Sequence, residues 1–473
     1  MKTRLNSTRR RRAFTYVTVV VTMIVVGLML AAYLKLVAVQ NQMTMRSQVW
    51  NRSVPVLEAG IEEALAHLNK NASPDAAGNF NPNLTADNWT LDADGGWWKL
   101  GSINGDYYYV KISPWPIGGG VPSEFPFIYS TGYVHQVPAF AINRSAGPFL
   151  AASILENLVL SNKVSRRVVQ GTTTNVPTFT KGLVCKGLID LNGKNIFTDS
   201  YNSTNPAYSD NGRWNAAEAL DHGDIASNDI LINVGNATVK GNIAVGPRGT
   251  AYVGNGVVGD AAFVSNPANQ GKIQDGHFRD DMNVEFLDPA VPVGSGGWTG
   301  LPSPSPTVIG TNTYQYVLNG GDYLISGTDT LSSKSIYIQG NVRIRVDTRI
   351  NMTGQDTITL ASGATLKIYA NCPDVTISGG GIINPGTSTS LSILGTPRCA
   401  SIALGGNSEF SGTIDAPNAD MIFNGGGSTM NDFSGAAKVK TAKFNGHYRF
   451  HYDEALPKIG AWRGFVLTSW NEK

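Results

Sequence analysis

The sequence predicts a mainly β protein that begins with a long transmembrane and amphipathic α-helix, continues into a small β-rich domain and ends in a parallel β-helix, or β-solenoid. Three observations support this. An apolar stretch at 14–34 runs on into a heptad-spaced stripe, aromatic segments with alternating pattern follow between 106 and 134, and short apolar triplets between Gly, Asn and Ser turns fill 181–455. Only 15% of the 473 residues are charged and 53 are Gly, which suits many short strands joined by turns.

The first element is a basic leader, residues 1–13, followed by an apolar span. Phe14 to Leu34 is 21 residues without a charge, about 31 Å as a helix, which matches the hydrocarbon core of a bilayer. The leader holds six of the 37 basic side chains. The positive-inside rule places it in the cytoplasm and the rest of the chain across the membrane.

The helix is expected to continue to residue 70. Apolar side chains recur every seven residues in two series, Met43, Trp50, Leu57 and Ala64, and Val54, Ile61 and Leu68. Pro55 interrupts the pattern and should kink the helix rather than end it. Residues 14–70 are therefore predicted to form one transmembrane and amphipathic helix.

A basic leader ending in a small residue, then Phe-Thr, an apolar span and a continuing helix: in these features the sequence resembles a type IV prepilin. The resemblance implies that prepilin peptidase cuts between Ala13 and Phe14 on the cytoplasmic side, that the new N-terminus is methylated, and that the apolar helix packs with its neighbours in a filament core. The segment "NRSVPVLEAGIEEALAHLN" at 51–69 resembles PilX-type minor pilins more narrowly.

Two positions depart from the family pattern. Ala13 stands where the family usually has Gly, and Thr18 stands where it usually has Glu. A carboxylate at position 18 could pair with the N-terminal ammonium of a neighbouring subunit, and Thr18 cannot. This suits a rare subunit, such as one at a filament tip, better than a major pilin. A fixed anchor that is never cleaved is the alternative.

Residues 71–180 are expected to form a β-rich, pilin-like domain. Strand patterns occur at 106–113, 126–134 and 164–170, and the first two are rich in aromatic residues. The segment 149–160 fits either a strand or a short helix.

Residues 181–455 are predicted to form the solenoid, with a β-sandwich as the alternative. Between Ile336 and Phe423 the apolar triplets come about every 8 to 17 residues, too close for βαβ units. The stretch 288–308 contains five prolines and is expected to be an insertion or strap between two solenoid halves. Residues 456–473 are expected to form a C-terminal cap. The strings "HYDEAL" and "SWNE" resemble the C-termini of large PilX-type proteins that carry solenoid domains.

Few residues suggest site chemistry. His447 and His451 are spaced to point the same way from a strand and are weak candidates for metal ligands, but Arg449 between them argues against a cation. Asp280 and Asp281 are adjacent and would point to opposite faces of a strand, and Asp415 is isolated. No catalytic residue, metal or cofactor is predicted.

The three cysteines cannot all pair within the chain. Cys372 and Cys399 could form a bridge in an oxidising compartment, but buried, unpaired thiols are the commoner outcome, and Cys185 is remote. Without the leader, 31 basic and 35 acidic residues leave a net charge of −4. A nucleic-acid binder would usually show a basic face.

The sequence therefore predicts a non-enzymatic, minor-pilin-like component of a type IV pilus or related filament. We expect a single-pass bacterial inner-membrane protein whose body is periplasmic, or extracellular within a pilus. Expected partners are other pilin and minor pilin subunits, the pilus assembly machinery, prepilin peptidase, and a surface or polysaccharide ligand in an adhesive or initiating role. The rival hypothesis is a membrane-tethered β-helix enzyme that degrades polysaccharide, with clustered carboxylates on one solenoid face.

Overall fold

The chain forms two compact units, and one is inserted into the other. The computed structural model describes residues 7–70, 73–74, 80–81, 84–113, 126–135, 164–292, 297–354, 356–378, 380–406, 409–425, 430–460 and 462–472. The helix–sheet unit comprises residues 1–71, 82–174 and 465–473, and the solenoid unit comprises 72–81 and 175–464. The prediction of a mainly β fold with a long N-terminal helix and many parallel strands is confirmed.

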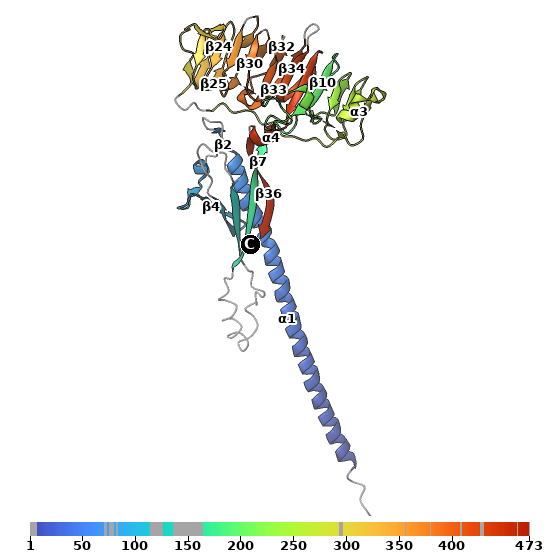
Figure 1. Cartoon of the computed structure of the whole chain (residues 1–473). Helices are drawn as coiled ribbons and strands as arrows, with labels where there is room; N and C mark the ends of the chain where they lie inside the picture. The colour runs from blue at the N-terminus through green and yellow to red at the C-terminus, as the bar shows by residue number, and fades with distance from the viewer. Residues whose placement is uncertain are drawn as a thin grey trace, which may run out of the picture. The chain divides into compact units, whose positions relative to one another are not determined.

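Helix α1 (Ser7–Lys70) dominates the helix–sheet unit (Figure 1). It runs through Pro55 without ending; the kink at this residue stays a prediction. Toward its C-terminal end the helix buries the apolar side chains Val56, Leu57, Ile61, Ala64 and Leu68. Four of these, Leu57, Ile61, Ala64 and Leu68, belong to the predicted seven-residue series, so periodicity correctly marked the face that packs.

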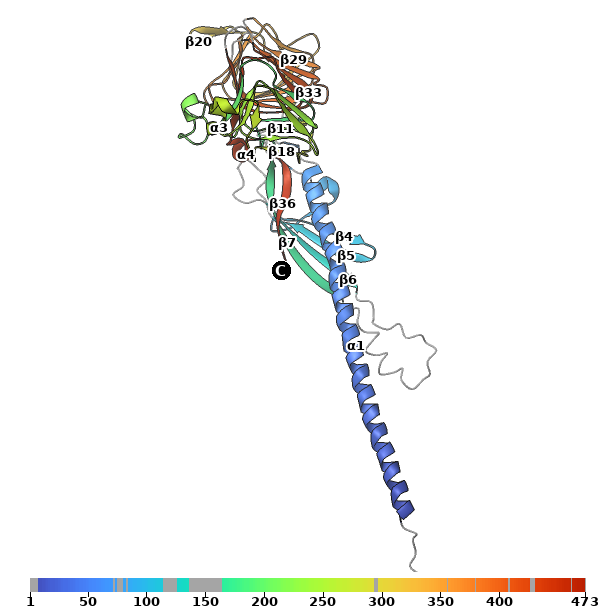
Figure 2. The ribbon, with the colours of Figure 1, turned by 90° about the vertical axis from the view of Figure 1, so that its right-hand side faces the viewer.

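A six-stranded sheet packs against this buried helix face (Figure 2). Its strands, in sheet order, are β3 (Thr90–Leu91), β4 (Trp97–Ile103), β5 (Asp106–Ile112), β6 (Phe127–His135), β7 (Val164–Pro177) and β36 (Trp462–Glu472). The pairs from β3 to β7 are antiparallel. Alternate residues of β5 are buried, as its sequence pattern predicts. A 3-10 helix, η1 (Leu84–Asp87), precedes the sheet, and the undecided segment 149–160 lies outside the described residues.

The first half of the solenoid unit stacks successive turns of the chain. Its strands are β8 (Leu183–Cys185), β9 (Ile189–Asp190), β10 (Ile196–Tyr201), β11 (Ile225–Ser227), β12 (Leu231–Gly235), β13 (Thr238–Lys240), β14 (Ile243–Ala244), β15 (Thr250–Val253), β16 (Val257–Gly259), β17 (Lys272–Ile273) and β18 (Phe278–Arg279). They form parallel columns, β8–β11–β14–β18, β9–β12–β15 and β10–β13–β16–β17. The loops contain η2 (Ala216–Glu218), α3 (Ala261–Ser265) and η3 (Pro267–Asn269).

The second half continues the same architecture. Its solenoid strands are β19 (Thr299–Gly300), β22 (Tyr316–Leu318), β23 (Gly321–Ile325), β24 (Ser335–Ile338), β25 (Asn341–Val346), β26 (Ile350–Met352), β27 (Thr357–Leu360), β28 (Thr365–Ala370), β29 (Asp374–Ile377), β30 (Gly381–Ile383), β31 (Leu391–Gly395), β32 (Ser401–Gly405), β33 (Phe410–Asn424), β34 (Asn431–Phe444) and β35 (Tyr448–Asp453). The columns are β19–β23–β25–β28–β31–β33, β26–β29–β32–β33 and β22–β24–β27–β30, all parallel. Smaller elements are the antiparallel pairs β1 (Ser73–Pro74) with β2 (Phe80–Asn81) and β20 (Thr307–Ile309) with β21 (Asn312–Tyr314), η4 (Ser388–Ser390) and α4 (Leu456–Ile459).

The two halves meet at a seam that sequence order does not predict. The last strand of the solenoid, β35, pairs in parallel with β10, from Ile196 opposite Tyr448 to Tyr201 opposite Asp453. Strand β34 pairs with β8 and β9. The chain thus enters the solenoid in the middle, builds toward one end, and later returns from the other end to close against its first rung. Figure 1 shows this as red strands lying beside green β10.

The solenoid core changes character at the seam. Away from it, aliphatic residues stack in register, as in the column of Ile344, Ile368 and Ile393. Beside the seam the column becomes aromatic: ring centroids are 4.0 Å apart for Phe423 and Phe444 and 4.5 Å for Phe433 and Phe450. These large side chains bury more apolar area per rung than aliphatic ones, which favours closure at this point.

An extended strap, residues 280–292, connects the halves along the outside of the sheet. Met282 packs on Val184, Ala226 and Ala244 of the first half. The Lys438 ammonium donates to the Glu285 carbonyl oxygen at 2.7 Å. The sequence placed the insertion at 288–308, whereas the covering segment starts earlier because small outward residues on β8, β11 and β14 accept apolar strap side chains.

The C-terminal residues differ from the expected cap. Within 456–473, Leu456 of α4 is buried against Phe179 and Tyr452 of the solenoid unit. The final strand β36 instead joins the six-stranded sheet beside β7, where the Thr468 hydroxyl donates to the Thr172 carbonyl oxygen at 3.1 Å. A strand needs a partner for its backbone groups, and β7 supplies one. The local sequence does not reveal which edge is available.

Candidate functional site

The candidate functional surface is the first part of α1. Its apolar side chains are largely exposed, including Phe14 at 76% and Met23 at 70%. Helix α1 from Phe14 onward is long and apolar enough to cross a membrane, with a mean hydropathy of 2.5 over its most apolar window. The predicted span limits, Phe14 and Leu34, thus lie on one continuous helix. Exposed apolar surface on this scale indicates contact with lipid or with other apolar helices.

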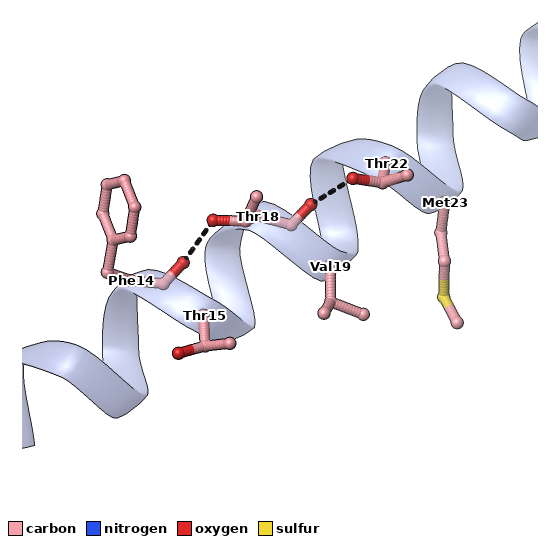
Figure 3. Close-up of a pocket in the computed structure, with 6 residues that line it drawn as sticks. All are labelled: Phe14, Thr15, Thr18, Val19, Thr22 and Met23. Carbon is pink, nitrogen blue, oxygen red and sulfur yellow. Dashed lines mark hydrogen bonds between the residues drawn. The ribbon is translucent and has the colours of Figure 1, made fainter.

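Polar groups at the start of this surface are satisfied within the helix. Figure 3 shows an open hollow on one helix face, lined by Phe14, Thr15, Thr18, Val19, Thr22 and Met23. The Thr18 hydroxyl donates to the Phe14 carbonyl oxygen at 2.7 Å, and the Thr22 hydroxyl donates to the Thr18 carbonyl oxygen at 2.7 Å. These bonds lower the cost of placing hydroxyls in an apolar medium.

The predicted cleavage point lies inside α1. The backbone of Ala13 is helical and continuous with Phe14, while the Ala13 side chain lies outside the described residues. Cleavage between them stays a prediction. Thr18 faces the hollow and carries no charge, so the surface holds no carboxylate to pair with a neighbouring ammonium.

Toward its other end, α1 is fixed to the sheet by polar contacts as well as apolar packing. The Tyr108 hydroxyl donates to the Glu63 carboxylate at 2.5 Å, and the Lys99 ammonium lies 2.8 Å from the same group. Burial and the Glu63 charge raise the pKa of Tyr108, which therefore stays a neutral donor. Arg52 pairs with the buried carboxylate of Asp106 at 2.9 Å. One rigid helix therefore carries an exposed apolar part and a part locked to a sheet.

The weak metal candidates do not come together as a metal site. His451 is fully buried, and its Nδ1 and Nε2 lie 2.5 Å from Asp199 and 3.1 Å from Asp432. His447 precedes β35 with a φ of 52° and lies 3.4 Å from the Asn195 amide. Among the described residues, no group of three or more His, Cys, Asp or Glu side chains has a metal-binding arrangement.

The carboxylates considered for catalysis are also dispersed. Asp280 and Asp281 are exposed at the start of the strap. Asp415 is buried on β33, opposite Lys438 in the strand register. The structure thus places Asp280 and Asp281 together on the strap and Asp415 on β33.

Sequence reasoning missed the buried ionic network around His451. Its members are Asp199 on β10, Asp432 on β34, and Arg449 and His451 on β35. Asp199 and His451 are 252 residues apart. The local signal is the density of charge in "HYRFHYDE" at 447–454, where His447 and His451 were considered only as weak metal candidates.

Comparison with known proteins finds a family model that matches part of the chain. Residues 306–459 match the family described as "Domain of unknown function (DUF7305)". This range covers the second half of the solenoid from β20 through α4. No curated protein matches the chain. Among solved structures, the competence-associated pilin ComZ from Thermus thermophilus aligns over 90% of this chain and 98% of its own, with 10% sequence identity and a TM-score of 0.22. Values this low do not establish a shared fold.

Proposed function

We propose that the protein is a minor-pilin-like structural component of a type IV pilus or related filament. The observation that carries this proposal is the division of α1 into two surfaces. Its exposed apolar part has the length of a membrane span, and its later part packs on an antiparallel sheet. The apolar part can reside in the inner membrane and then exchange lipid for the helices of neighbouring subunits, because both environments are apolar.

The proposed role is packing and display rather than catalysis. The long segment of the solenoid unit, residues 175–464, is connected to the helix–sheet unit through β7 at its start and β36 at its end. In this proposal the body lies in the periplasm, or outside the cell within a pilus. The solenoid then serves as an adhesive or assembly-initiating module. Its partners are other pilin subunits and the assembly machinery.

The internal hydrogen bond of Thr18 supports a special position in the filament. A Thr18 hydroxyl bonded to Phe14 offers no charge to the subunit above it. A subunit at a tip has no such neighbour. We therefore assign the protein to the tip or to the initiating complex rather than to the shaft.

The first experiment is the mass of the N-terminal peptide, from protein made with and without prepilin peptidase. We expect a chain beginning at Phe14, with a methylated amine, only when the peptidase is present. Ala13→Gly is the control that should still be cut, and Ala13→Trp should not. A wild-type chain that keeps residues 9–13 beside an active peptidase would make the helix a fixed anchor and exclude the pilin role.

The display role has a separate test. Cells that lack the protein are compared with wild-type cells for pilus number and for surface binding by atomic-force pulling. We expect pilus number, surface binding or both to be lower in cells that lack the protein, and to return to the wild-type level when the gene is restored. Unchanged piliation together with unchanged binding would contradict both the initiating and the adhesive role.

A further inference from the structure

The seam of the solenoid unit is crossed by a buried network of charges. Asp199 belongs to β10 in the first half, whereas Asp432, Arg449 and His451 belong to β34 and β35 in the second. In the strand register, Asp199 lies opposite His451, and Arg449 lies opposite Asp432. The network therefore links the first part of the solenoid, in sequence order, to its last part.

The contacts define the charge of the imidazole. His451 Nδ1 is 2.5 Å from Asp199 Oδ1, and Nε2 is 3.1 Å from Asp432 Oδ1. An ionised carboxylate only accepts hydrogen bonds, so both ring nitrogens must donate, which requires the protonated imidazolium. Arg449 also forks onto Asp432, with bonds of 2.6 and 2.7 Å. Two cations then balance two carboxylates, and no buried charge is left unpaired.

A loop of the first half covers this network. The Trp214 indole stacks on the His451 ring with centroids 3.7 Å apart, and the Arg449 guanidinium lies 5.2 Å from the Trp214 ring. The indole N–H points to Asp199 Oδ2 at 3.3 Å. The neighbouring Arg213 pairs at 2.7 Å with Glu409, a residue of the second half. The His451 and Asp199 side chains beneath this cover are fully buried, which strengthens their charge pair, whereas Arg449 and Asp432 keep 34% and 21% of their side chains exposed.

The connections to the helix–sheet unit arrive at the same place. The chain enters the solenoid unit just before β8 and leaves it just after β35, and both strands lie at the seam. Near these two points, Phe179 packs with Tyr452 and Leu456.

We infer that the network is a proton-operated latch that holds the two halves of the solenoid closed in one register. With His451 protonated and both Asp residues ionised, the seam is closed. Loss of the imidazolium proton, or protonation of Asp432, leaves a partner unpaired and opens the seam while each half keeps its own rungs. This inference concerns the solenoid unit alone and does not rest on the filament role.

The pH window follows from the groups that face His451, namely Asp199, Asp432, Arg449 and Trp214. Burial alone would lower the pKa of His451, but hydrogen bonds to the two carboxylates raise it above the ordinary value of 6.5. Burial would raise the pKa of Asp432, but hydrogen bonds from His451 and Arg449 lower it below 3.8. The stabilisation is therefore lost as pH rises through the raised His451 value, or falls through the lowered Asp432 value.

The test is hydrogen exchange with mass spectrometry on the full chain, corrected for the intrinsic pH dependence of exchange. In Asp432→Asn we expect peptides covering 196–201 and 448–453 to exchange about ten-fold faster, the effect of losing one charge-assisted hydrogen bond. Asp322→Asn is the matched control. Asp322 also lies opposite an arginine in the register and is bound by it at both oxygens, but on β23 and β25, away from the seam. The Asp322→Asn substitution should speed exchange in β23 and β25 and leave exchange at the seam unchanged.

A second measurement tests the inference if the Asp432→Asn variant does not fold. In the wild-type chain, corrected exchange at the seam should rise as the pH increases through the raised pKa of His451, and in His451→Gln this rise should disappear. Equal seam exchange in wild type and Asp432→Asn would overturn the inference. So would faster seam exchange in Asp322→Asn, or a wild-type seam whose protection does not change with pH.

Discussion

At the scale of single residues, Leu57 is the contact that anchors α1 to its sheet. Its side chain is fully buried, and its carbonyl oxygen accepts a bond of 2.9 Å from the Ser130 hydroxyl on β6. Gly132 of β6 lies against Leu57, and a side chain there would meet it at 3.2 Å. The close approach leaves no room for rearrangement, so shortening Leu57 would leave a cavity.

We predict that Leu57→Ala lowers the free energy of unfolding of the helix–sheet unit by about 2–4 kcal/mol, from lost apolar burial and the cavity. Leu100→Ala, at a site that is 59% exposed on β4, should change it by less than about 0.5 kcal/mol. The measurement is urea unfolding in detergent micelles, followed by the exchange protection of β5 and β6. Equal losses in both variants would show that the helix does not dock through Leu57.

The cysteines give a second residue-scale prediction. All three thiols are free and buried. Burial raises the pKa of Cys372 to about 11 and of Cys399 to about 12, and it also raises the pKa of Cys185. Because the thiolate is the reactive form, we expect none of the three to react with iodoacetamide in the native protein at neutral pH.

The control for this prediction is alkylation after unfolding in denaturant without a reducing agent. All three thiols should then be modified, as read by the mass of the intact chain. Modification of one thiol instead of three would mean that Cys372 and Cys399 are bridged. Modification of any thiol in the native state would contradict its burial.

At this scale, contacts between residues close in sequence could be predicted, and contacts between residues far apart in sequence could not. Leu57, Ile61 and Ala64 were found because a helix repeats its buried face locally. The partners of His451 were not, because Asp199 and Asp432 reach it through strand register. Register is set by stacking of whole rungs, and no short pattern around Asp199 or Asp432 differs from that of an ordinary turn or strand residue.

At the scale of elements, α1 changes its surroundings along its length. Ile24 is 57% exposed, and Met43 is 64% exposed, so both lie on uncovered parts of the helix. Only the first belongs to the predicted membrane span. Exposure alone therefore does not distinguish the part of α1 that contacts lipid from the part that contacts water. Introducing charged residues into each part, and comparing the effect on membrane association, does distinguish them.

We predict that Ile24→Glu combined with Leu28→Glu removes the protein from the membrane fraction. Two carboxylates near the bilayer centre cost about 5–7 kcal/mol, which offsets most of the favourable insertion of the span. The matched control is Met43→Glu with Ser47→Glu, at the same spacing beyond the span, and should leave the fractionation unchanged. Retention of both variants after alkaline washing would contradict a span at 14–34.

The strap illustrates why some elements were predictable and others were not. Its prolines exclude a central strand, so the sequence predicts an insertion near 288–308, and this stays a prediction. The covering segment that begins at 280 has no such signal, because Met282 has no local pattern and gains its place from the small outward residues Val184, Ala226 and Ala244. The stacking order of the rungs also could not be predicted, because each apolar triplet can stack equally well on a rung that precedes it or follows it in sequence.

At the scale of the whole molecule, the solenoid unit is an insertion between neighbouring strands. Strands β7 and β36 lie side by side in the sheet although more than 280 residues separate them. The Arg167 guanidinium on β7 binds the Glu472 carboxylate on β36 with bonds of 2.9 and 2.8 Å and stacks over Trp50 of α1. The helix–sheet unit therefore completes its own sheet and its own buried face without residues from the solenoid.

We predict that each unit folds without the other. Replacing residues 178–461 by a short Gly/Ser linker should leave the contact between α1 and the sheet intact, because neighbouring strands need only a short connection. Residues 178–460 alone should give a folded β-solenoid, because the seam between β10 and β35 lies wholly within it. The measurements are circular dichroism melting and limited trypsin digestion of both products beside the full chain. A helix–sheet product digested as fast as an unfolded chain would show that the sheet depends on the solenoid. A solenoid that melts only when the helix–sheet unit is present would show the reverse dependence.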